Sequence, residues 1–199
     1  MSGLEKLDKR KKAVFLDRDG TINSDEYGYV KDTHEFQLYS FAKKALTKLK
    51  KCNLLLFLVT NQSGIARGYY SFADLATIHS KMQNQLGEAA FDDIFISPYH
   101  IQGFVKPYNI SHADRKPGLG MFKQAVQKHD FQIKGSYMIG DKYTDIEFGK
   151  KAGLITILVQ TGKGREEFLF KRQEWSYKPD FIADNLLVAA ELIEKLEKK

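Results

Sequence analysis

Four separated groups of polar residues in this chain combine side chain types that could carry out chemistry together. The first is Asp17 and Asp19, two carboxylates one residue apart that end an apolar run of strand length. Because side chains alternate along an extended chain, both should point to the same side, with Arg18 pointing away. Two carboxylates that share a small volume repel each other, and a divalent cation is the usual remedy. We therefore expect a metal-dependent site at this strand end.

The other three groups combine hydroxyl, amide, cationic and carboxylate side chains. They are Thr60 and Asn61 with Ser63, Arg115 and Lys116, and Asp141 and Asp145. Carboxylates suit magnesium, whereas hydroxyl, amide, guanidinium and ammonium groups suit phosphate oxygens. The combination predicts phosphoryl transfer.

Apolar runs of strand length alternate with segments of helical periodicity along the chain. The predicted strands are 13–16, 54–59, 94–96, 137–139, 155–159 and 180–183, and the predicted helices are 41–51, 71–86, one after Pro117, one ending at 152, and 186–196. Such alternation indicates an α/β fold, an open and mostly parallel sheet with helices on both faces. Ligands bind beyond the carboxyl ends of the strands in such sheets, so the four polar groups should meet there. The segment 161–176 gives no clear pattern.

The length of the chain and the gaps between the polar groups set the domain organisation. A chain of 199 residues fits a single domain over 1–199, and we expect residues 1–12 to be a flexible N-terminus. Neither the gap from Asp17 to Thr60 nor that from Thr60 to Lys116 has room for a large cap domain. Two loops, 23–32 and 97–116, should instead lie over an open site.

Composition and charge narrow the class of protein. A hydrophobic content of 43% and a charged content of 28% are those of an ordinary globular domain. The net charge of +6 fits an anionic ligand, but the lysines are scattered, so we do not expect a nucleic-acid partner. The lone Cys52 excludes an internal disulfide and a cysteine-based zinc site. With no signal-peptide pattern and no apolar run long enough for a bilayer, we expect a cytoplasmic protein without a membrane partner.

In order and spacing, the four groups resemble the signature motifs of the haloacid dehalogenase (HAD) superfamily of phosphatases, over residues 14–161. These motifs read Asp17-x-Asp19-Gly20-Thr21, Thr60-Asn61, Lys116 and Gly140-Asp141-x-x-x-Asp145. Finer features resemble the branch that contains heptose bisphosphate and histidinol-phosphate phosphatases. They are Phe15 to Asn23, Thr60 to Gly68, Arg115-Lys116-Pro117 and Gly28-Tyr29-Val30.

This resemblance implies a role for each acidic residue. Asp17 would be the nucleophile that forms an aspartyl-phosphate, and Asp19 would protonate the leaving oxygen and then activate water. Mg²⁺ would be held by Asp17, the backbone carbonyl of Asp19, and Asp141. Asp145 would orient the lysine or a metal-bound water.

The same resemblance assigns the remaining polar residues to the phosphate and the substrate, and these are Thr60, Asn61, Arg115, Lys116 and Lys142. Other basic and aromatic residues stay outside the predicted machinery. We expect Arg67 to pair with a nearby acid and His79 to lie on a helix face, and Tyr27 and Tyr29 either line the pocket or pack over it.

The substrate implied is a small phosphorylated sugar, with a heptose 1,7-bisphosphate first, and the protein is expected to be a monomer. Three further functions remain open: a histidinol-phosphate or other small-molecule phosphatase, a nucleic-acid 3′-end phosphatase, and a non-catalytic module that binds phosphate ligands. One departure from the family concerns its Cys-x-His…Cys-x-Cys zinc loop, whose positions read approximately Ser97, Tyr99, His112 and Asp114. Without thiolates we expect no zinc, and packing of Phe104, Tyr108 and Ile110 should hold this loop.

Overall fold

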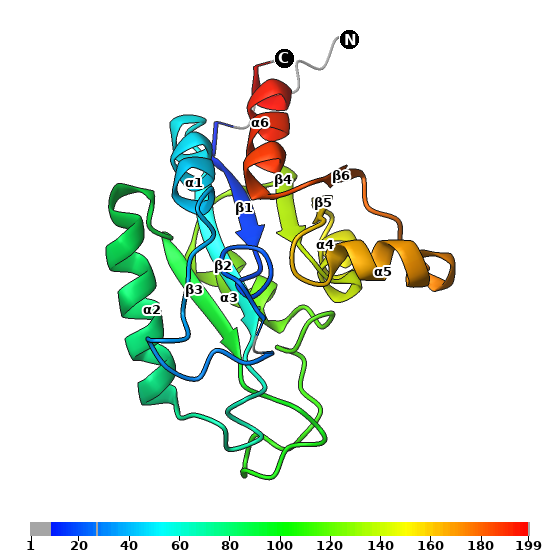
Figure 1. Cartoon of the computed structure of the whole chain (residues 1–199). Coiled ribbons are helices and arrows are strands. Elements are labelled where there is room, and N and C mark those ends of the chain that lie inside the picture. The colour runs from blue at the N-terminus through cyan, green and yellow to red at the C-terminus, as the bar shows by residue number, and fades with distance from the viewer. Residues whose placement is uncertain (1–8, 27, 199) are drawn as a thin grey trace.

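The computed structural model describes residues 9–26 and 28–198. Its strands are β1 (Lys12–Leu16), β2 (Leu55–Asn61), β3 (Asp93–Ser97), β4 (Gln132–Gly140), β5 (Ile155–Val159) and β6 (Phe181–Ala183). They form one sheet in the order β3-β2-β1-β4-β5-β6, and every pairing between them is parallel (Figure 1). The predicted open parallel sheet is confirmed.

Helices cover both faces of this sheet. They are α1 (Ala42–Lys51), α2 (Phe72–Leu86), α3 (Gly120–Lys128), α4 (Tyr143–Lys151), α5 (Gly164–Lys171) and α6 (Leu186–Glu197), with short 3₁₀ turns η1 (Gly87–Ala89) and η2 (Arg172–Glu174). Apolar side chains of α1, α2 and α6 share one core with the sheet, and those of α3 and α4 share the other. None of the helices in the described part of the chain is both long enough and apolar enough to cross a membrane.

The central strand β1 shows how the sequence produces these layers. Val14 and Leu16 enter the core under α1, α2 and α6, whereas Ala13 and Phe15 enter the core under α3 and α4. All four side chains are fully buried. Full burial of such an apolar side chain contributes roughly 1.5–3 kcal/mol, so the apolar run fixes β1 in the middle of the molecule. It thereby fixes the place where Asp17 leaves the sheet.

Helix α2 begins where the sequence predicts. Ser71 caps it, because its hydroxyl accepts from the backbone N–H of Asp74 at 3.2 Å while the Asp74 carboxylate accepts from the Ser71 N–H at 2.8 Å. The predicted apolar face is buried, and it includes Ile78 and His79. Phe72 is the exception, since it lies in the first turn and is 43% exposed.

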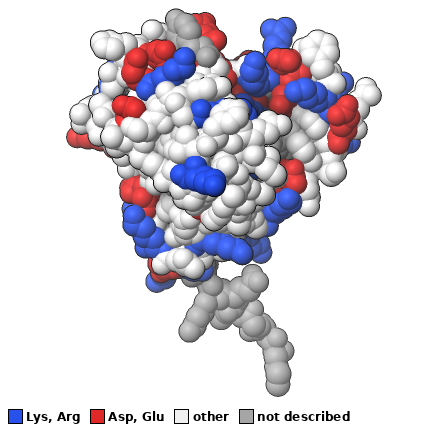
Figure 2. All heavy atoms as spheres, turned by 90° about the horizontal axis from the view of Figure 1, so that it is seen from below, with Lys and Arg blue, Asp and Glu red and all other residues white. Residues whose placement is uncertain are grey.

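Both loops predicted to cover the site lie at the carboxyl edge of the sheet, and no cap domain is present among the described residues. The segment 97–116 docks on the loop after β2, where the backbone N–H groups of Phe104 and Val105 donate to the Ala66 carbonyl at 2.7 and 2.9 Å. Figure 2, seen from this side, shows side chains of both charges scattered over the face, without a continuous basic band. The described part of the segment 1–12 includes Lys12, which begins β1; residues 1–8 and Tyr27 lie outside the described residues.

The predicted packing of the 97–116 loop is only partly right. Tyr108 is half-buried, and its ring contacts those of Phe72 and Tyr99. Phe104 and Ile110 are 80% and 46% exposed, so they do not hold the loop. Backbone hydrogen bonds to Ala66 do so instead, and they leave no periodic trace in the sequence.

Candidate active site

The site lies where β1 and β4 end side by side. The chain runs outward from β1 to β3 on one side and from β4 to β6 on the other, so the sheet has its topological switch point here. Asp17 follows β1, with its backbone N–H donating to the Ile139 carbonyl of β4 at 3.0 Å, and Asp141 follows β4. Strand topology therefore brings together two acids that are far apart in the sequence.

A buried lysine organises these acids. The Lys116 ammonium lies 2.9 Å from Asp17 Oδ1 and 2.7 Å from Asp145 Oδ1, and it donates to the Val59 carbonyl at 2.7 Å. Burial alone would lower the pKa of Lys116, but the carboxylates of Asp145 and Asp17 outweigh it and raise that pKa. Lys116 is therefore a fixed positive charge against the predicted nucleophile.

Asn61 positions this lysine. Its amide nitrogen donates to the Lys116 carbonyl at 3.1 Å, and its amide oxygen accepts from the Lys116 N–H at 3.0 Å. Because both polar atoms of the side chain are used, Asn61 holds the backbone of the lysine loop, which differs from the phosphate contact predicted for it. Thr60, unlike Asn61, does not line the cavity: it is fully buried, and its hydroxyl accepts from the Gln62 amide at 2.8 Å.

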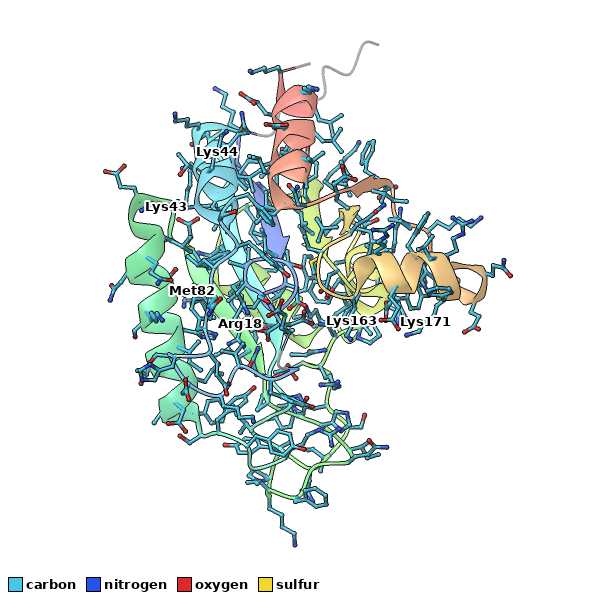
Figure 3. The ribbon with its side chains drawn as sticks, in the orientation of Figure 1. Arg18, Lys43, Lys44, Met82, Lys163 and Lys171 are labelled. Carbon is cyan, nitrogen blue, oxygen red and sulfur yellow. The ribbon has the colours of Figure 1, made fainter. Side chains whose placement is uncertain are left out.

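Asp19 is held on both carboxylate oxygens. Arg18 donates to them through Nε and Nη2 at 2.7–2.9 Å, Asn23 donates to Oδ1 at 3.0 Å, and Gln62 donates to Oδ2 at 2.8 Å. Arg18 therefore does not point away as predicted; its fully buried guanidinium group donates to the neighbouring Asp19 carboxylate, and Figure 3 labels Arg18 between the end of β1 and α2. Burial would raise the pKa of Asp19, but Arg18 and Asn23 hold it below its usual value.

Asp141 is enclosed by backbone. Its Oδ2 accepts from the Lys163 N–H at 2.9 Å, and a Cβ on Gly20 or Gly162 would come within 2.3 or 2.4 Å of that oxygen. Both glycines have positive φ, +84° and +52°, so a side chain at either position would be strained as well as obstructed. Burial raises the pKa of Asp141 well above its ordinary value.

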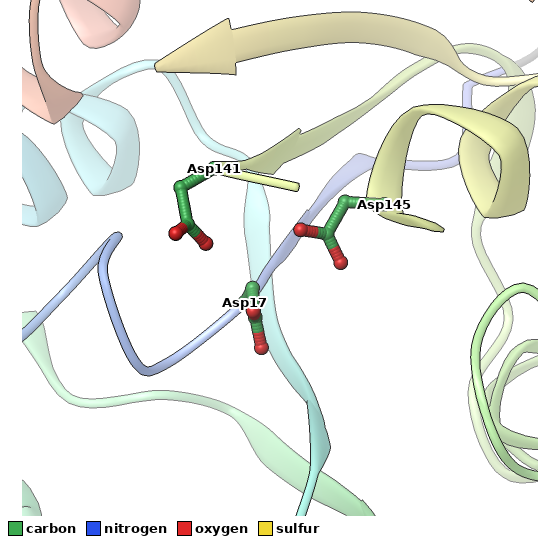
Figure 4. Close-up of side chains that lie close together, drawn as sticks. All are labelled: Asp17, Asp141 and Asp145. Carbon is green, nitrogen blue, oxygen red and sulfur yellow. The ribbon is translucent and has the colours of Figure 1, made fainter. Parts of the chain in front are cut away.

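The donor set at this point fits a divalent cation. Carboxylate oxygens of Asp17, Asp141 and Asp145 lie within 4.8 Å of one another, and Figure 4 shows the three side chains close together at the ends of β1 and β4. Asp141 Oδ1 is buried without a hydrogen-bond partner, and the nearest cation, the Lys142 ammonium, is 3.6 Å away. A buried carboxylate oxygen without a partner is costly unless a cation binds it.

The three carboxylates are not equivalent as metal ligands. Asp145 already pairs with Lys116, and its other oxygen accepts from the Lys142 N–H at 3.0 Å, as expected of a residue that orients the lysine. Asp17, whose Oδ1 contacts Lys116, and Asp141, whose Oδ1 has no hydrogen-bond partner, each have a carboxylate oxygen that could bind a metal ion. The side chain of Asp19 belongs to the Arg18 network, so Asp19 could contribute to a metal site through its backbone carbonyl, as the family resemblance implies.

We expect Asp141→Asn to weaken Mg²⁺ binding roughly 1,000-fold, because a unit charge about 4 Å from another contributes about 4 kcal/mol at an effective dielectric constant of about 20, and each 1.4 kcal/mol is about tenfold in affinity. The amide oxygen can still accept from Lys163, so the fold should persist. The measurement is the Mg²⁺ concentration that gives half of the maximal rise in melting temperature, compared with exposed Asp184→Asn as control. Equal Mg²⁺ dependence in both variants would contradict the metal assignment.

A cavity of about 270 Å³ opens in front of these acids. Its lining includes the predicted residues Asp17, Asp19, Asn61, Arg115, Lys116, Lys142 and Asp145, and also Asp25, Gly28, Tyr29, Gln62, Ser63, Tyr70 and Thr144. Tyr29 therefore lines the pocket. Gln62 and Tyr70 were not predicted as site residues; strand alternation from Thr60 could have suggested Gln62, but nothing local distinguishes Tyr70.

The four positions of the family's zinc loop adopt another arrangement here. The rings of Tyr99 and His112 stack with centroids 3.9 Å apart, and His112 Nδ1 lies 3.4 Å from Asp114. Ser97 is fully buried at the end of β3. Aromatic stacking thus occupies part of the space between these positions.

The sequence motifs predict a parallel α/β sheet with a buried lysine and three acids at its switch point, and this is the arrangement observed. Comparisons with known protein families, sequences and structures agree with it. The family model described as HAD-hydrolase-like matches residues 113–189. D-glycero-D-manno-heptose-1,7-bisphosphate 7-phosphatase from Thermosynechococcus vestitus is 37% identical over 91% of this chain and 94% of that protein. D-glycero-beta-D-manno-heptose-1,7-bisphosphate 7-phosphatase from Pasteurella multocida is 43% identical over 87% of this chain and 94% of that protein.

Solved structures show the same likeness. The crystal structure of D,D-heptose 1.7-bisphosphate phosphatase from B. bronchiseptica, complexed with magnesium and phosphate, superposes with a TM-score of 0.81 at 30% identity. It covers 93% of this chain and 99% of its own. The chain belongs to the HAD superfamily of phosphatases and is a phosphoric monoester hydrolase. Within that superfamily it falls in the branch that contains the heptose bisphosphate phosphatases.

Proposed function

We propose that this protein removes the 7-phosphate of a D-glycero-D-manno-heptose 1,7-bisphosphate through an aspartyl-phosphate on Asp17, with Mg²⁺ as cofactor. The observation that carries the proposal is the Lys116 ammonium fixed between Asp17 and Asp145, beside the partnerless oxygen of Asp141 and in front of an open cavity. The names of the relatives, which extend over most of the chain, support the substrate.

The first step forms a bond between an Asp17 carboxylate oxygen and phosphorus while the bond from phosphorus to the C7 oxygen breaks. The electron pair of the broken bond stays on that oxygen, which takes a proton from Asp19. Because Asp19 has a lowered pKa, it is ionised in the free site, and the proton arrives with the substrate monoanion, whose second pKa is about 6. Asp19 relays it from a phosphoryl oxygen to the leaving oxygen.

In the second step water attacks the phosphorus of the aspartyl-phosphate and gives a proton to Asp19, while the bond from phosphorus to the Asp17 oxygen breaks and the Asp17 carboxylate is restored. Asp19 then loses this proton to the departing phosphate or to water, which returns the site to its ionised state. Lys116 and Lys142 offset negative charge on the transferring group throughout. Asp17 and Asp141, with the Asp19 carbonyl, would hold Mg²⁺, which when bound neutralises charge on the phosphoryl oxygens.

Cationic groups beside the cavity favour a second phosphate over the histidinol amine. Arg115 lines the cavity, and its pKa is lowered by burial and by Arg67 nearby. Arg67 has no acidic partner among the described residues, unlike the expectation from the sequence; it contacts His100 at 3.3 Å, and its Nε is buried without a hydrogen bond. Two guanidinium groups attract a phosphate and repel an ammonium.

A nucleic-acid substrate and a purely binding role both find less support. A nucleic-acid end would need a basic track to the site, and the face in Figure 2 carries mixed charges. A non-catalytic binding module would not need Asp19 to be held by three different side chains.

The test is the release of phosphate, with Mg²⁺ and with chelator, from heptose 1,7-bisphosphate, heptose 7-phosphate, histidinol phosphate and a 3′-phosphorylated oligonucleotide. We expect kcat/KM for the bisphosphate to exceed that for the 7-phosphate roughly 10- to 100-fold, since hydrogen bonds to a charged group contribute about 1.5–3 kcal/mol. Arg67→Met should remove most of this preference while leaving heptose 7-phosphate turnover within about threefold. Phosphorus NMR would identify the phosphate lost.

Each contrary outcome has a definite meaning. Turnover of histidinol phosphate or the oligonucleotide in preference to both sugars would replace the proposed substrate and keep the mechanism. No Mg²⁺-dependent turnover of any ester by folded protein would favour the binding module. The proposal also places a monomer in the cytoplasm, without zinc; light scattering would test the monomer, and metal analysis would test the zinc.

A further inference from the structure

We propose that His79 of α2 is a positioning residue for Asp19 and acts through the guanidinium group of Arg18. The inference rests on the proposed role of Asp19 as proton donor and acceptor. Arg18 is fully buried, and its Nη1 lies 3.2 Å from His79 Nε2 (Figure 3 shows Arg18 beside α2). His79 itself is 6% exposed and 61 residues away in the chain.

The guanidinium group of Arg18 contacts two side chains, those of Asp19 and His79, through different nitrogens. Nε and Nη2 donate to the Asp19 carboxylate and hold both of its oxygens. The third nitrogen of the group, Nη1, does not contact Asp19. Its hydrogen-bond partner in the described part of the chain is His79. A guanidinium N–H left without an acceptor in a buried place costs about 1–3 kcal/mol or more, so Arg18 would turn to recover a partner. Any such turn moves its hydrogen bonds to Asp19.

The imidazole is suited to accept from arginine. Burial and the neighbouring Arg18 lower the pKa of His79 to about 3, so the ring is neutral at pH 7. A neutral ring that accepts through Nε2 carries its proton on Nδ1. A charged ring would oppose the guanidinium group, whereas the neutral one supplies a lone pair and no charge.

Helix α2 makes this contact rigid. The Ser71 capping box fixes its first turn, and Leu75, Ile78 and Met82 are fully buried on the same face as His79. A second restraint on Asp19 comes from the loop after β2, where the Tyr70 hydroxyl donates to Gln62 at 2.6 Å and Gln62 donates to Asp19. The carboxylate is therefore held between α2 and the loop after β2.

A loosened Asp19 affects the protonation of the leaving oxygen and leaves the phosphate contacts in place. Lys116, Lys142 and the metal site would bind the phosphoryl group. The ion pairs of these two lysines and the three carboxylates of the metal site do not involve His79. Loss of His79 should therefore lower kcat with little change in KM. In kcat/KM, which reports the first step alone, the loss should be large for an alkyl phosphate, whose leaving oxygen needs a proton, and small for 4-nitrophenyl phosphate, whose leaving group departs as an anion.

The experiment compares His79→Leu, His79→Gln and the buried control Ile78→Val, with Asp19→Asn as the lower limit. For the sugar phosphate that the wild type hydrolyses, we expect His79→Leu to lower kcat about 10- to 100-fold, with KM within about twofold. The amide oxygen of His79→Gln can accept from Arg18, so this variant should recover activity to within about threefold of wild type. Ile78→Val, which loses a methylene from the same face, should stay near wild type.

Two results would overturn the inference while the wild type remains an active phosphatase. One is an equal loss in kcat/KM for the sugar phosphate and 4-nitrophenyl phosphate, which would indicate general damage. The other is a nitrogen NMR spectrum in which His79 Nε2 carries a proton at pH 7. If the wild type hydrolyses no phosphate ester, the proposed function is wrong, and this inference, which depends on it, is wrong as well.

Discussion

Asp17→Asn is expected to lower phosphate release roughly a thousandfold or more, because an amide cannot form the acyl-phosphate and removal of a nucleophile leaves only the catalysis due to binding. The fold should survive, since Lys116 keeps its contacts with Asp145 and the Val59 carbonyl. Steady-state kinetics measures the first effect. Acid quenching and mass spectrometry should detect a phosphoryl group on the peptide that contains Asp17 in wild type only.

Glu88→Gln is the matched control for this variant. Glu88 is an exposed carboxylate in η1, at the amino-terminal end of β3, away from the site. It should retain wild-type turnover. If Asp17→Asn keeps more than about a tenth of the activity, Asp17 is not the nucleophile, and water would then attack the substrate directly.

Lys116→Met is expected to destabilise the fold by about 3–5 kcal/mol and to remove measurable turnover. The reason is that Asp17 and Asp145 would remain buried without their common cation, and removing one partner of a buried ion pair leaves an uncompensated charge. Urea unfolding at pH 7 measures the change in the free energy of unfolding, provided that the slope with urea stays unchanged.

A double variant separates the charge effect from lost packing. Adding Asp145→Asn to Lys116→Met removes one of the unpaired charges, so the pair should be less destabilised than the sum of the single variants. Mg²⁺ should also stabilise Lys116→Met, because a cation at the acid cluster replaces part of the missing charge. Additive losses without any Mg²⁺ effect would indicate that Lys116 acts by packing alone.

The motifs alone were enough to predict where the chemistry lies. Asp17 follows β1, Lys116 precedes α3 and Asp145 lies in the first turn of α4, and parallel strands bring their carboxyl ends to one edge. The resemblance to the family then supplied the roles, and the ion pairs of Lys116 agree with the orienting role expected for Asp145.

The sequence did not predict the hydrogen-bond partner of a polar side chain where several partners were available to it. Asn61 could have faced a phosphate, but both of its amide atoms bind the backbone of Lys116, 55 residues away. His79 was expected only to occupy a helix face, and Arg18 to point outward. Their contact joins a loop and a helix that approach each other only after folding, so no local spacing signals it.

The same limit applies to the segment 161–176, whose sequence gives no clear pattern. Residues 164–171 form α5 although its apolar side chains do not repeat on one face: Phe168 packs toward Trp175, while Leu169 and Phe170 are 54% and 77% exposed. Tertiary contact with Trp175 and Tyr143 stabilises a helix whose own pattern is weak.

By itself the sequence determined the order of the strands and of the helices other than α5, the parallel sheet and the four polar groups, because side-chain periodicity and the ends of apolar runs are local properties. Tertiary structure decided which partner each buried charge receives: Lys116 between Asp17 and Asp145, Arg18 between Asp19 and His79, and Asp141 with one oxygen left for a cation. The physical reason is that a buried charge takes its free energy from neighbours brought together by folding, and these neighbours are distant in the sequence.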